Sequence, residues 1–206
     1  MAEAIAVAKE LNSTHGLAVA LGHAAVLGYC ERNPVKVERL ASDLIELSTR
    51  QNFEIWLAVG EVHRGWARSL AGGTAEGVAR IEGVIRDYRA NCSMMLSPLL
   101  LALKAEALYF SDRTSEALKA IREAEALAEE REERWWSAEL HRLRGVFLTA
   151  MGAEETQIEA SFCEAITTAR EQKSVSLEKR AEATYAEYRT QKASASGGRG
   201  FRLPLC

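Results

Sequence analysis

Apolar residues recur along most of the chain at spacings of three and four, the pattern typical of one buried face of an α-helix. Small residues stand inside four of these stretches at intervals of forty: Ala25, Gly65, Ala105 and Gly145. A break follows each small residue at a similar distance, and a second apolar-periodic stretch follows each break. The pattern therefore predicts a repeated unit of forty residues that consists of two helices.

The breaks contain the residue types that begin and end helices. They fall at Asn33-Pro34, Gly72-Gly73-Thr74, Ser111–Thr114 and Met151–Glu154. Asn33, Thr74 and Thr114 are expected to cap the second helices, because their side chains can accept from the free amides of a first helical turn. Pro34 suits a first helical position. We expect four helix hairpins, whose second helices end near Thr49, Arg89, Glu129 and Arg170.

The small residue of each unit is expected where the two helices of a hairpin meet closely, since a larger side chain would push them apart. The second helices carry matching apolar stripes, such as Val37, Leu40, Ala41 and Leu44 in the first unit. One hairpin cannot bury both of its faces, so stacking of the units is predicted. The expected fold class is all-α, an α-solenoid over residues 1–192, followed by a Gly/Ser-containing flexible tail over 193–206.

Both ends of the array are expected to hold an incomplete unit. Ala2–Leu11 falls in the register of a second helix without its first helix, and Ser176–Lys192 in that of a first helix without its second. Helices without hairpin partners leave apolar faces open, so a homo-oligomer formed through these segments is one expected arrangement.

Charge and hydropathy exclude several classes of partner. The 206 residues contain 26 Lys and Arg against 29 Asp and Glu, a net charge of -3 that does not favour nucleic acid or an acidic membrane surface. The N-terminal residues lack the basic region of a secretory signal. The longest uncharged apolar stretch, residues 17–30, is shorter than the roughly 20 residues of a bilayer span. We expect a cytoplasmic protein without a membrane segment.

No residue pattern predicts catalysis or a cofactor. The cysteines, Cys30, Cys92, Cys163 and Cys206, are scattered, which favours reduced thiols over zinc ligands or disulfides. His23 and His63 lie forty residues apart, and no carboxylate or thiol recurs with them at the spacing of metal ligands. We therefore expect both histidines to lie at helix interfaces. Residues 72–77 resemble a phosphate loop, but Val78-Ala79 stand where Lys and Ser/Thr are required, so a turn is predicted. We expect no enzyme, no metal and no cofactor.

Three segments carry a resemblance to a known family: Phe53–Ala58, Arg64–Ala67 and Arg134–Gly145, the last with the adjacent Trp135 and Trp136. On these segments the chain resembles the tetratricopeptide-repeat array at the C-terminal end of bacterial multidomain signalling regulators. Those regulators place a class III adenylate-cyclase or DNA-binding domain ahead of a signal-transduction ATPase domain. The resemblance implies a tetratricopeptide-like solenoid and a protein-binding role in signalling or transcription control.

Two sets of residues are candidates for binding. Arg64, Lys104 and Arg144 each precede the small residue of a unit, so stacking would align them in a column that could receive an acidic helix. The alternative is that each pairs with a glutamate on a neighbouring helix. Trp66 shares its repeat position with Glu106, a position that faces the concave groove in the family's geometry, and packing against the next unit is the alternative. Trp56 and Trp136 are expected to pack between hairpins.

We therefore expect a non-catalytic protein-interaction module. Its ligand would be a helix or extended peptide with acidic and apolar residues, lying along Trp66, Tyr109 and Arg142 beside the column of cations. The candidate binding residues are Arg64, Trp66, Lys104, Glu106, Tyr109, Arg142 and Arg144. Two alternatives stay open: a regulatory fragment of a split or truncated adenylate-cyclase-type enzyme, and a self-associating structural scaffold.

Overall fold

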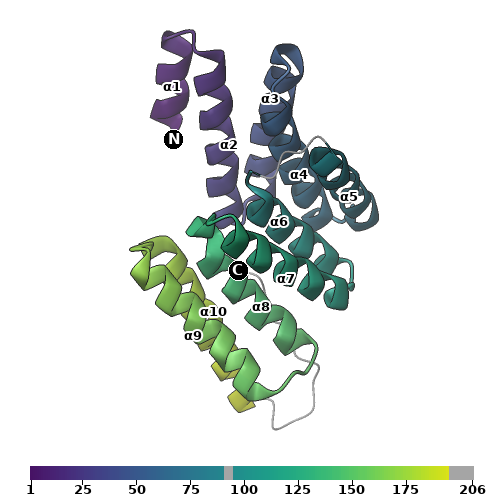
Figure 1. Ribbon diagram of the computed structural model, residues 1–206, viewed down its shortest axis with the longest axis vertical. Coiled ribbons are helices and arrows are strands. Elements are labelled where there is room, and N and C mark those ends of the chain that lie inside the picture. The colour runs from purple at the N-terminus through teal and green to yellow at the C-terminus, as the bar shows by residue number, and fades with distance from the viewer. Residues whose placement is uncertain (91–94, 195–206) are drawn as a thin grey trace. The chain divides into compact units, whose positions relative to one another are not determined.

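The computed structural model describes residues 1–90 and 95–194, and over these residues it is all-helical and has no strand (Figure 1). The helices are α1 (Ala2–Glu10), α2 (Thr14–Cys30), α3 (Pro34–Gln51), α4 (Glu54–Leu70), α5 (Thr74–Ala90), α6 (Ser97–Phe110), α7 (Thr114–Glu130), α8 (Ser137–Ala150), α9 (Glu155–Glu171) and α10 (Val175–Ser194). A short 3-10 turn, Arg134–Trp136, precedes α8. The tail predicted over 193–206 lies outside the described residues from position 195 onward.

The four predicted hairpins are present as α2/α3, α4/α5, α6/α7 and α8/α9. Their second helices end at Gln51, Ala90, Glu130 and Glu171, each within two residues of the predicted position. The additional helices predicted at the two ends are α1 and α10.

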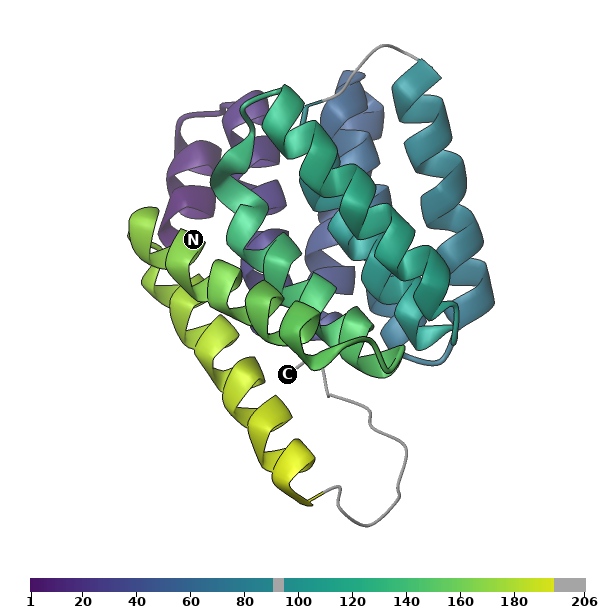
Figure 2. The same cartoon turned by 60° about the horizontal axis from the view of Figure 1, so that its bottom comes forward.

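The helices form two compact units, Met1–Met95 with α1–α5 and Leu96–Cys206 with α6–α10. In each unit every helix packs against the next one along the chain. First helices of successive hairpins also touch: α2 packs on α4 in the first unit, and α8 packs on both α6 and α10 in the second (Figures 1 and 2). Each unit is thus a stack of hairpins, as the apolar faces require.

The turns inside the hairpins repeat in backbone geometry as well as in sequence. Arg32, Gly72, Asp112 and Gly152 lie forty residues apart and all have positive φ, between 54° and 103°. After each of them, the next amide donates to the carbonyl five residues back, at 3.0 Å in all four turns. This left-handed closure satisfies carbonyls at the helix end and stops the helix. The breaks seen in the sequence therefore mark one recurring turn.

One of the three predicted N-caps is confirmed. The Asn33 side chain accepts from the amide of Lys36 at 2.9 Å. The predictions for Thr74 and Thr114 are wrong, because each is the first residue of its helix, and Arg113 holds the cap position of α7 without a side-chain cap bond. A residue with helical backbone angles does not hold its side chain over the free amides, whereas a cap residue does.

The small residues lie where the prediction placed them, at the closest approach of the two helices. A Cβ added to Gly65 would lie 2.6 Å from Cγ1 of Ile81 on α5, and one added to Gly145 would lie 2.7 Å from Cε1 of Phe162 on α9. Ala25 is fully buried in the α2/α3 hairpin. Any larger side chain at these positions would separate the helices.

Candidate functional site

Two of the tryptophans lie between α2 and α4. Trp66 is fully buried, with its ring 5.0 Å from that of Tyr29 and the Arg32 guanidinium 5.4 Å from its centroid. Trp56 packs against Gly22, which confirms the predicted inter-hairpin contact. Trp66 therefore adopts the packing alternative and does not face an open groove.

A buried charge network occupies the stack of α6, α8 and α10. Arg142 donates from Nε and Nη2 to Glu139 at 2.9 and 2.7 Å, and its Nη2 lies 3.7 Å from Glu106. Arg180 of α10 donates to Glu139 at 3.2 Å. Arg142, Glu139 and Glu106 are at most 1% exposed. Burying so many charges is favourable only where they neutralise one another, so this network belongs to the core.

The expected docking line along Trp66, Tyr109 and Arg142 is thus not a surface of the folded chain. Tyr109 is 3% exposed and its ring lies 5.1 Å from that of Phe147. Trp66 contacts Tyr29 of α2, and Arg142 contacts Glu106 of α6 and Thr184 of α10, so both lie on helix faces that turn toward neighbouring first helices. The prediction failed because it treated a face between stacked helices as an open face.

The cations of the predicted column have acidic neighbours. Arg64 pairs with Glu61 at 2.8 Å, a glutamate of its own helix α4 and not of a neighbouring helix as the alternative expected. Lys104 is half-buried on α6. The hydrogen bond from Arg113 lowers the pKa of Glu116 on α7, and the positive charge of Lys104 adds a smaller effect in the same direction.

Arg144 bridges three helices of the second unit. It donates to Ser161 at 3.0 Å, to Glu125 of α7 at 2.8 Å and to Glu164 of α9. The pairing alternative, a glutamate on a neighbouring helix, is therefore confirmed for Arg144.

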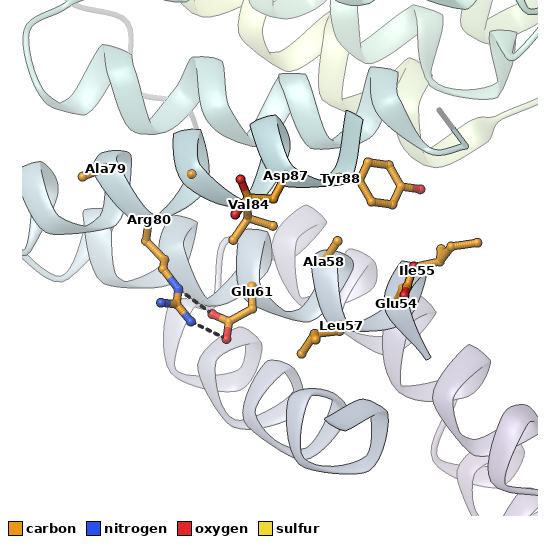
Figure 3. A pocket seen from close by; sticks show the side chains of 11 residues that line it. Glu54, Ile55, Leu57, Ala58, Glu61, Ala79, Arg80, Val84, Asp87 and Tyr88 are labelled. Atoms are coloured by element: carbon orange, nitrogen blue, oxygen red, sulfur yellow. Dashed lines mark hydrogen bonds and ion pairs between the residues drawn. The ribbon is translucent and has the colours of Figure 1, made fainter. Parts of the chain in front are cut away.

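A hollow of about 520 Å³ opens along the line where α4 and α5 face each other, which we call the α4/α5 seam (Figure 3). Its walls are mostly apolar, and Glu54 and Asp87 add negative charge. The residues that line it are Glu54, Ile55, Leu57, Ala58, Glu61, Ala79, Arg80, Gly83, Val84, Asp87 and Tyr88. All of them belong to the first unit.

The hollow is present because this hairpin departs from its neighbours at two repeat positions. Glu61 takes the position of Leu21 in α2 and Leu101 in α6, forty residues away on either side. Arg80 takes the position of Leu40 in α3, and of an alanine in α7. The three leucines are at most 6% exposed and close their own seams with apolar side chains. In the α4/α5 hairpin an ion pair spans the seam instead (Figure 3).

Glu61 is held by two arginines. Arg80 donates from Nε at 3.0 Å and from Nη2 at 2.7 Å, and Nη2 of Arg64 donates to both carboxylate oxygens. Burial by itself raises the pKa of this carboxyl, but the hydrogen bonds and charges of Arg80 and Arg64 outweigh burial, so the pKa of Glu61 is lowered. One carboxylate shared by two guanidinium groups leaves the cluster with one positive charge.

A second hollow of about 340 Å³ lies on the same seam, beyond Arg80. Arg64, Arg68 and Arg80 line it together with Glu76, and Nε of Arg68 also donates to Glu38 of α3 at 3.1 Å. The seam thus has an apolar half with acidic residues and a polar half with three arginines, and Arg80 lines both. Such an arrangement can hold an apolar side chain beside a charged one.

The described part of the chain offers no metal centre, since it contains no group of three or more His, Cys, Asp or Glu side chains placed to hold an ion. Cys30 and Cys163 form no disulfide, and Cys92 and Cys206 lie outside the described residues. Among the described helices, none is long and apolar enough to cross a membrane.

Glu61 and Arg80 were not among the residues predicted to bind, although the sequence contains a signal for them. Aligning the forty-residue units shows charged residues at positions where the neighbouring units have apolar ones. Such a departure inside a helical repeat indicates a seam that its own side chains do not close.

Comparison with known proteins gives a distant similarity and shows no family. No family model matches the chain. It is 23% identical over 177 residues to the uncharacterized protein R02095 of Rhizobium meliloti (strain 1021). The aligned region covers 86% of this chain and 17% of that protein, so the chain spans less than a fifth of the length of this relative.

Proposed function

We propose that this chain is a tetratricopeptide-like helical-repeat module that binds a protein or peptide ligand and performs no catalysis. The observation that carries the proposal is the open α4/α5 seam, whose two hollows lie at positions that neighbouring hairpins fill with their own side chains. Concave, mostly apolar surfaces with a few fixed polar groups are the usual ligand sites of proteins.

The ligand would place an apolar side chain in the larger hollow, against Val84 and Tyr88, and a polar or charged group near the arginines of the smaller one. The ion pair between Glu61 and Arg80 keeps these charged side chains in place before binding, which lowers the entropic cost of association. The site differs from the docking line expected from the sequence, because that line is buried.

A role in bacterial signalling or transcription control extends this proposal. It rests on the resemblance of segments such as Arg134–Gly145 to the arrays of signalling regulators, and the bacterial source of the similar protein is compatible with it. Regulation of a separately encoded cyclase-type domain stays a prediction. Co-purification of such a domain with this chain from the native cell would test it.

The experiment that tests binding compares the wild type with a variant whose seam is closed. The double substitution Glu61→Leu and Arg80→Leu copies the α2/α3 seam into the α4/α5 hairpin. Partners captured from the native cell by the wild type should be lost from the variant, and hydrogen exchange in α4 and α5 should slow only in the wild-type complex. Capture of the same partners by a folded variant overturns the proposal.

A further inference from the structure

Among the described residues, α1 and α10 each lack a hairpin partner. The missing partner of α1 is a first helix, and that of α10 is a second helix. Asn12 and Asn52 lie forty apart with φ of 50° and 55°, which places α1 in the register of the second helix α3. Ala186 follows Gly145 by forty-one residues, the same step that separates the starts of α7 and α9, so it takes the small-residue position of a first helix. One end thus presents a second helix, and the other a first helix.

The open face of α1 is apolar. Ala4 and Val7 take the repeat positions of Leu44 and Leu47, which are 0% and 7% exposed in the α2/α3 hairpin. In α1 these positions are exposed, Val7 by 45%. Met1 and Leu11 are also exposed large apolar residues, and all three large side chains line a hollow of about 710 Å³ against α2. Exposed apolar side chains gathered in one hollow indicate an interaction surface.

The hollow corresponds to a groove that is filled elsewhere in the same unit. On α4, Trp56 and Val59 lie on the face that packs against α2, and they take the repeat positions of Gly16 and Val19. Gly16 and Val19 line the α1/α2 hollow. Since α2 packs against both α3 and α4, the groove between α1 and α2 has the shape of a seat for a preceding first helix.

The exposed face of α10 is small and suited to close packing. Ala183 and Ala186 are exposed on the face of α10 opposite its buried residues, among them Leu177 and Tyr188. Val175, at the start of the helix, is 59% exposed. An alanine at the small-residue position allows close helix packing, as Ala25, fully buried at the same position of the α2/α3 hairpin, shows.

We propose that α10 of one copy of this chain packs into the α1/α2 hollow of a second copy, so that α10 and α1 complete a helix hairpin between two molecules. This inference is independent of the ligand site on α4/α5. The repeat register gives the contacts: Met1 takes the position of Ile81, so it lies opposite Ala186 as Ile81 lies opposite Gly65.

Charge supports the same register. Val7 and Val175 take the positions of Asp87 and Glu54, which line one hollow of the α4/α5 seam, so the two exposed valines would face the same hollow. Glu3 and Lys179 take the positions of Gly83 and Ala58, which line the same hollow. The intermolecular hairpin thus brings a negative and a positive side chain together beside an apolar contact, and opposite charges at this spacing attract.

The interface uses different surfaces on the two copies. A molecule whose α10 is bound still has its α1/α2 hollow free for another copy, so the association is head to tail and either continues or closes into a ring. Because the two surfaces differ, a substitution that disrupts one of them should leave the other able to bind a second copy.

The test uses two full-length variants with one damaged end each, Val7→Lys on α1 and Ala186→Arg on α10. Sedimentation velocity over a wide concentration range should show self-association of the wild type, weakened at least about tenfold in each variant. An equimolar mixture of the two variants should form a one-to-one heterodimer, because the intact α10 of the first fits the intact hollow of the second. Glu3→Lys should weaken association, and Lys179→Glu in the same chain should restore it.

Controls separate the interface from general effects of charge. Val35→Lys and Ala160→Arg introduce the same side chains at exposed helical positions outside both faces and should leave association unchanged. Leu11→Lys repeats the α1 test at a residue that is 73% exposed, and circular dichroism checks the fold of every variant. A wild type that stays monomeric at all concentrations, or a mixture of the two variants that stays monomeric, overturns the proposal.

Discussion

His23 and His63 lie forty residues apart and contact their own helices in the same way, but only His63 is buried. Nδ1 of His23 lies 2.9 Å from the carbonyl of Val19, and Nδ1 of His63 lies 2.8 Å from that of Val59. His63 is fully buried, whereas His23 is exposed and lines the α1/α2 hollow. Equal repeat positions thus have different environments, because α2 covers this face of α4 while no described helix covers the same face of α2.

The burial of His63 predicts a pH dependence of stability. Burial lowers the pKa of His63 to about 4, although the bond to the Val59 carbonyl opposes the shift. Between pH 6.5 and pH 4 the unfolded chain binds a proton at this site that the folded chain does not, so stability falls as the pH falls. At about 1.4 kcal/mol per pH unit, the loss from this group over that range is about 3 kcal/mol.

Chemical unfolding at a series of pH values measures this loss. The His63→Gln variant should show a smaller fall in the free energy of unfolding between pH 6.5 and pH 4 than the wild type. His23→Gln, the same substitution at the exposed equivalent position, is the matched control. Equal slopes for the wild type and His63→Gln would contradict the prediction.

Two glycines of α5 should respond in opposite ways to alanine. A Cβ at Gly77 would lie 2.6 Å from the carbonyl oxygen of Gly65, so Gly77→Ala forces α4 and α5 apart and should cost about 1–3 kcal/mol or more. At Gly83 the nearest atom to an added Cβ is 3.7 Å away, on Arg86. Gly83→Ala should therefore raise stability by about 0.5–1 kcal/mol through helix propensity.

Thermal and urea unfolding of the two variants check this pair. Because both substitutions add one methyl group to the same helix, a general effect of alanine is excluded by the comparison. Similar stability changes of the same sign in the two variants would show that the α4/α5 contact is looser than described.

Removing Arg142 should destabilise the second unit strongly. Arg142→Met leaves Glu139 and Glu106 in the core without their main cation, and breaking a buried ion pair from one side typically costs about 3–5 kcal/mol. Replacing the arginine and Glu139 together by apolar residues should cost less than the sum of the single substitutions. A double-mutant cycle on the free energy of unfolding measures the difference, and additive effects would contradict the network.

Closing the α4/α5 seam should keep or raise stability. In Glu61→Leu with Arg80→Leu, two apolar side chains replace an ion pair, a change that is often neutral or stabilising by about 1–4 kcal/mol in buried settings. Since the side chain of Arg80 is 56% exposed, the gain should lie at the low end of that range. Glu61→Leu alone should destabilise, because it removes the shared partner of Arg64 and Arg80.

Urea midpoints of the single and double variants test this order of stabilities. If the double variant is less stable than Glu61→Leu alone, the two positions do not form the closed seam that the α2/α3 hairpin has.

The residue pattern was sufficient to predict the helices, their pairing and the turns that end them. Small residues such as Gly65 and Gly145 recur at intervals of forty residues, and apolar residues recur at spacings of three and four. This pattern predicts paired helices, because helix periodicity and close packing within a hairpin both depend on neighbours along the chain. The unpartnered helices at the two ends were also predictable, since they follow from counting units.

Which faces are open depends on how the helices pack in space. Trp66 and Arg142 have the residue types of a binding site, yet both are buried, because first helices of the same unit cover them: α2 covers Trp66, and α6 and α10 cover Arg142. Glu61 and Arg80 have the residue types of an ordinary surface pair, yet they hold a seam apart at positions where the α2/α3 hairpin has leucine. Residue spacing predicts which residues share a face of a helix. Whether a ligand can reach that face depends on which helices from elsewhere in the chain pack against it.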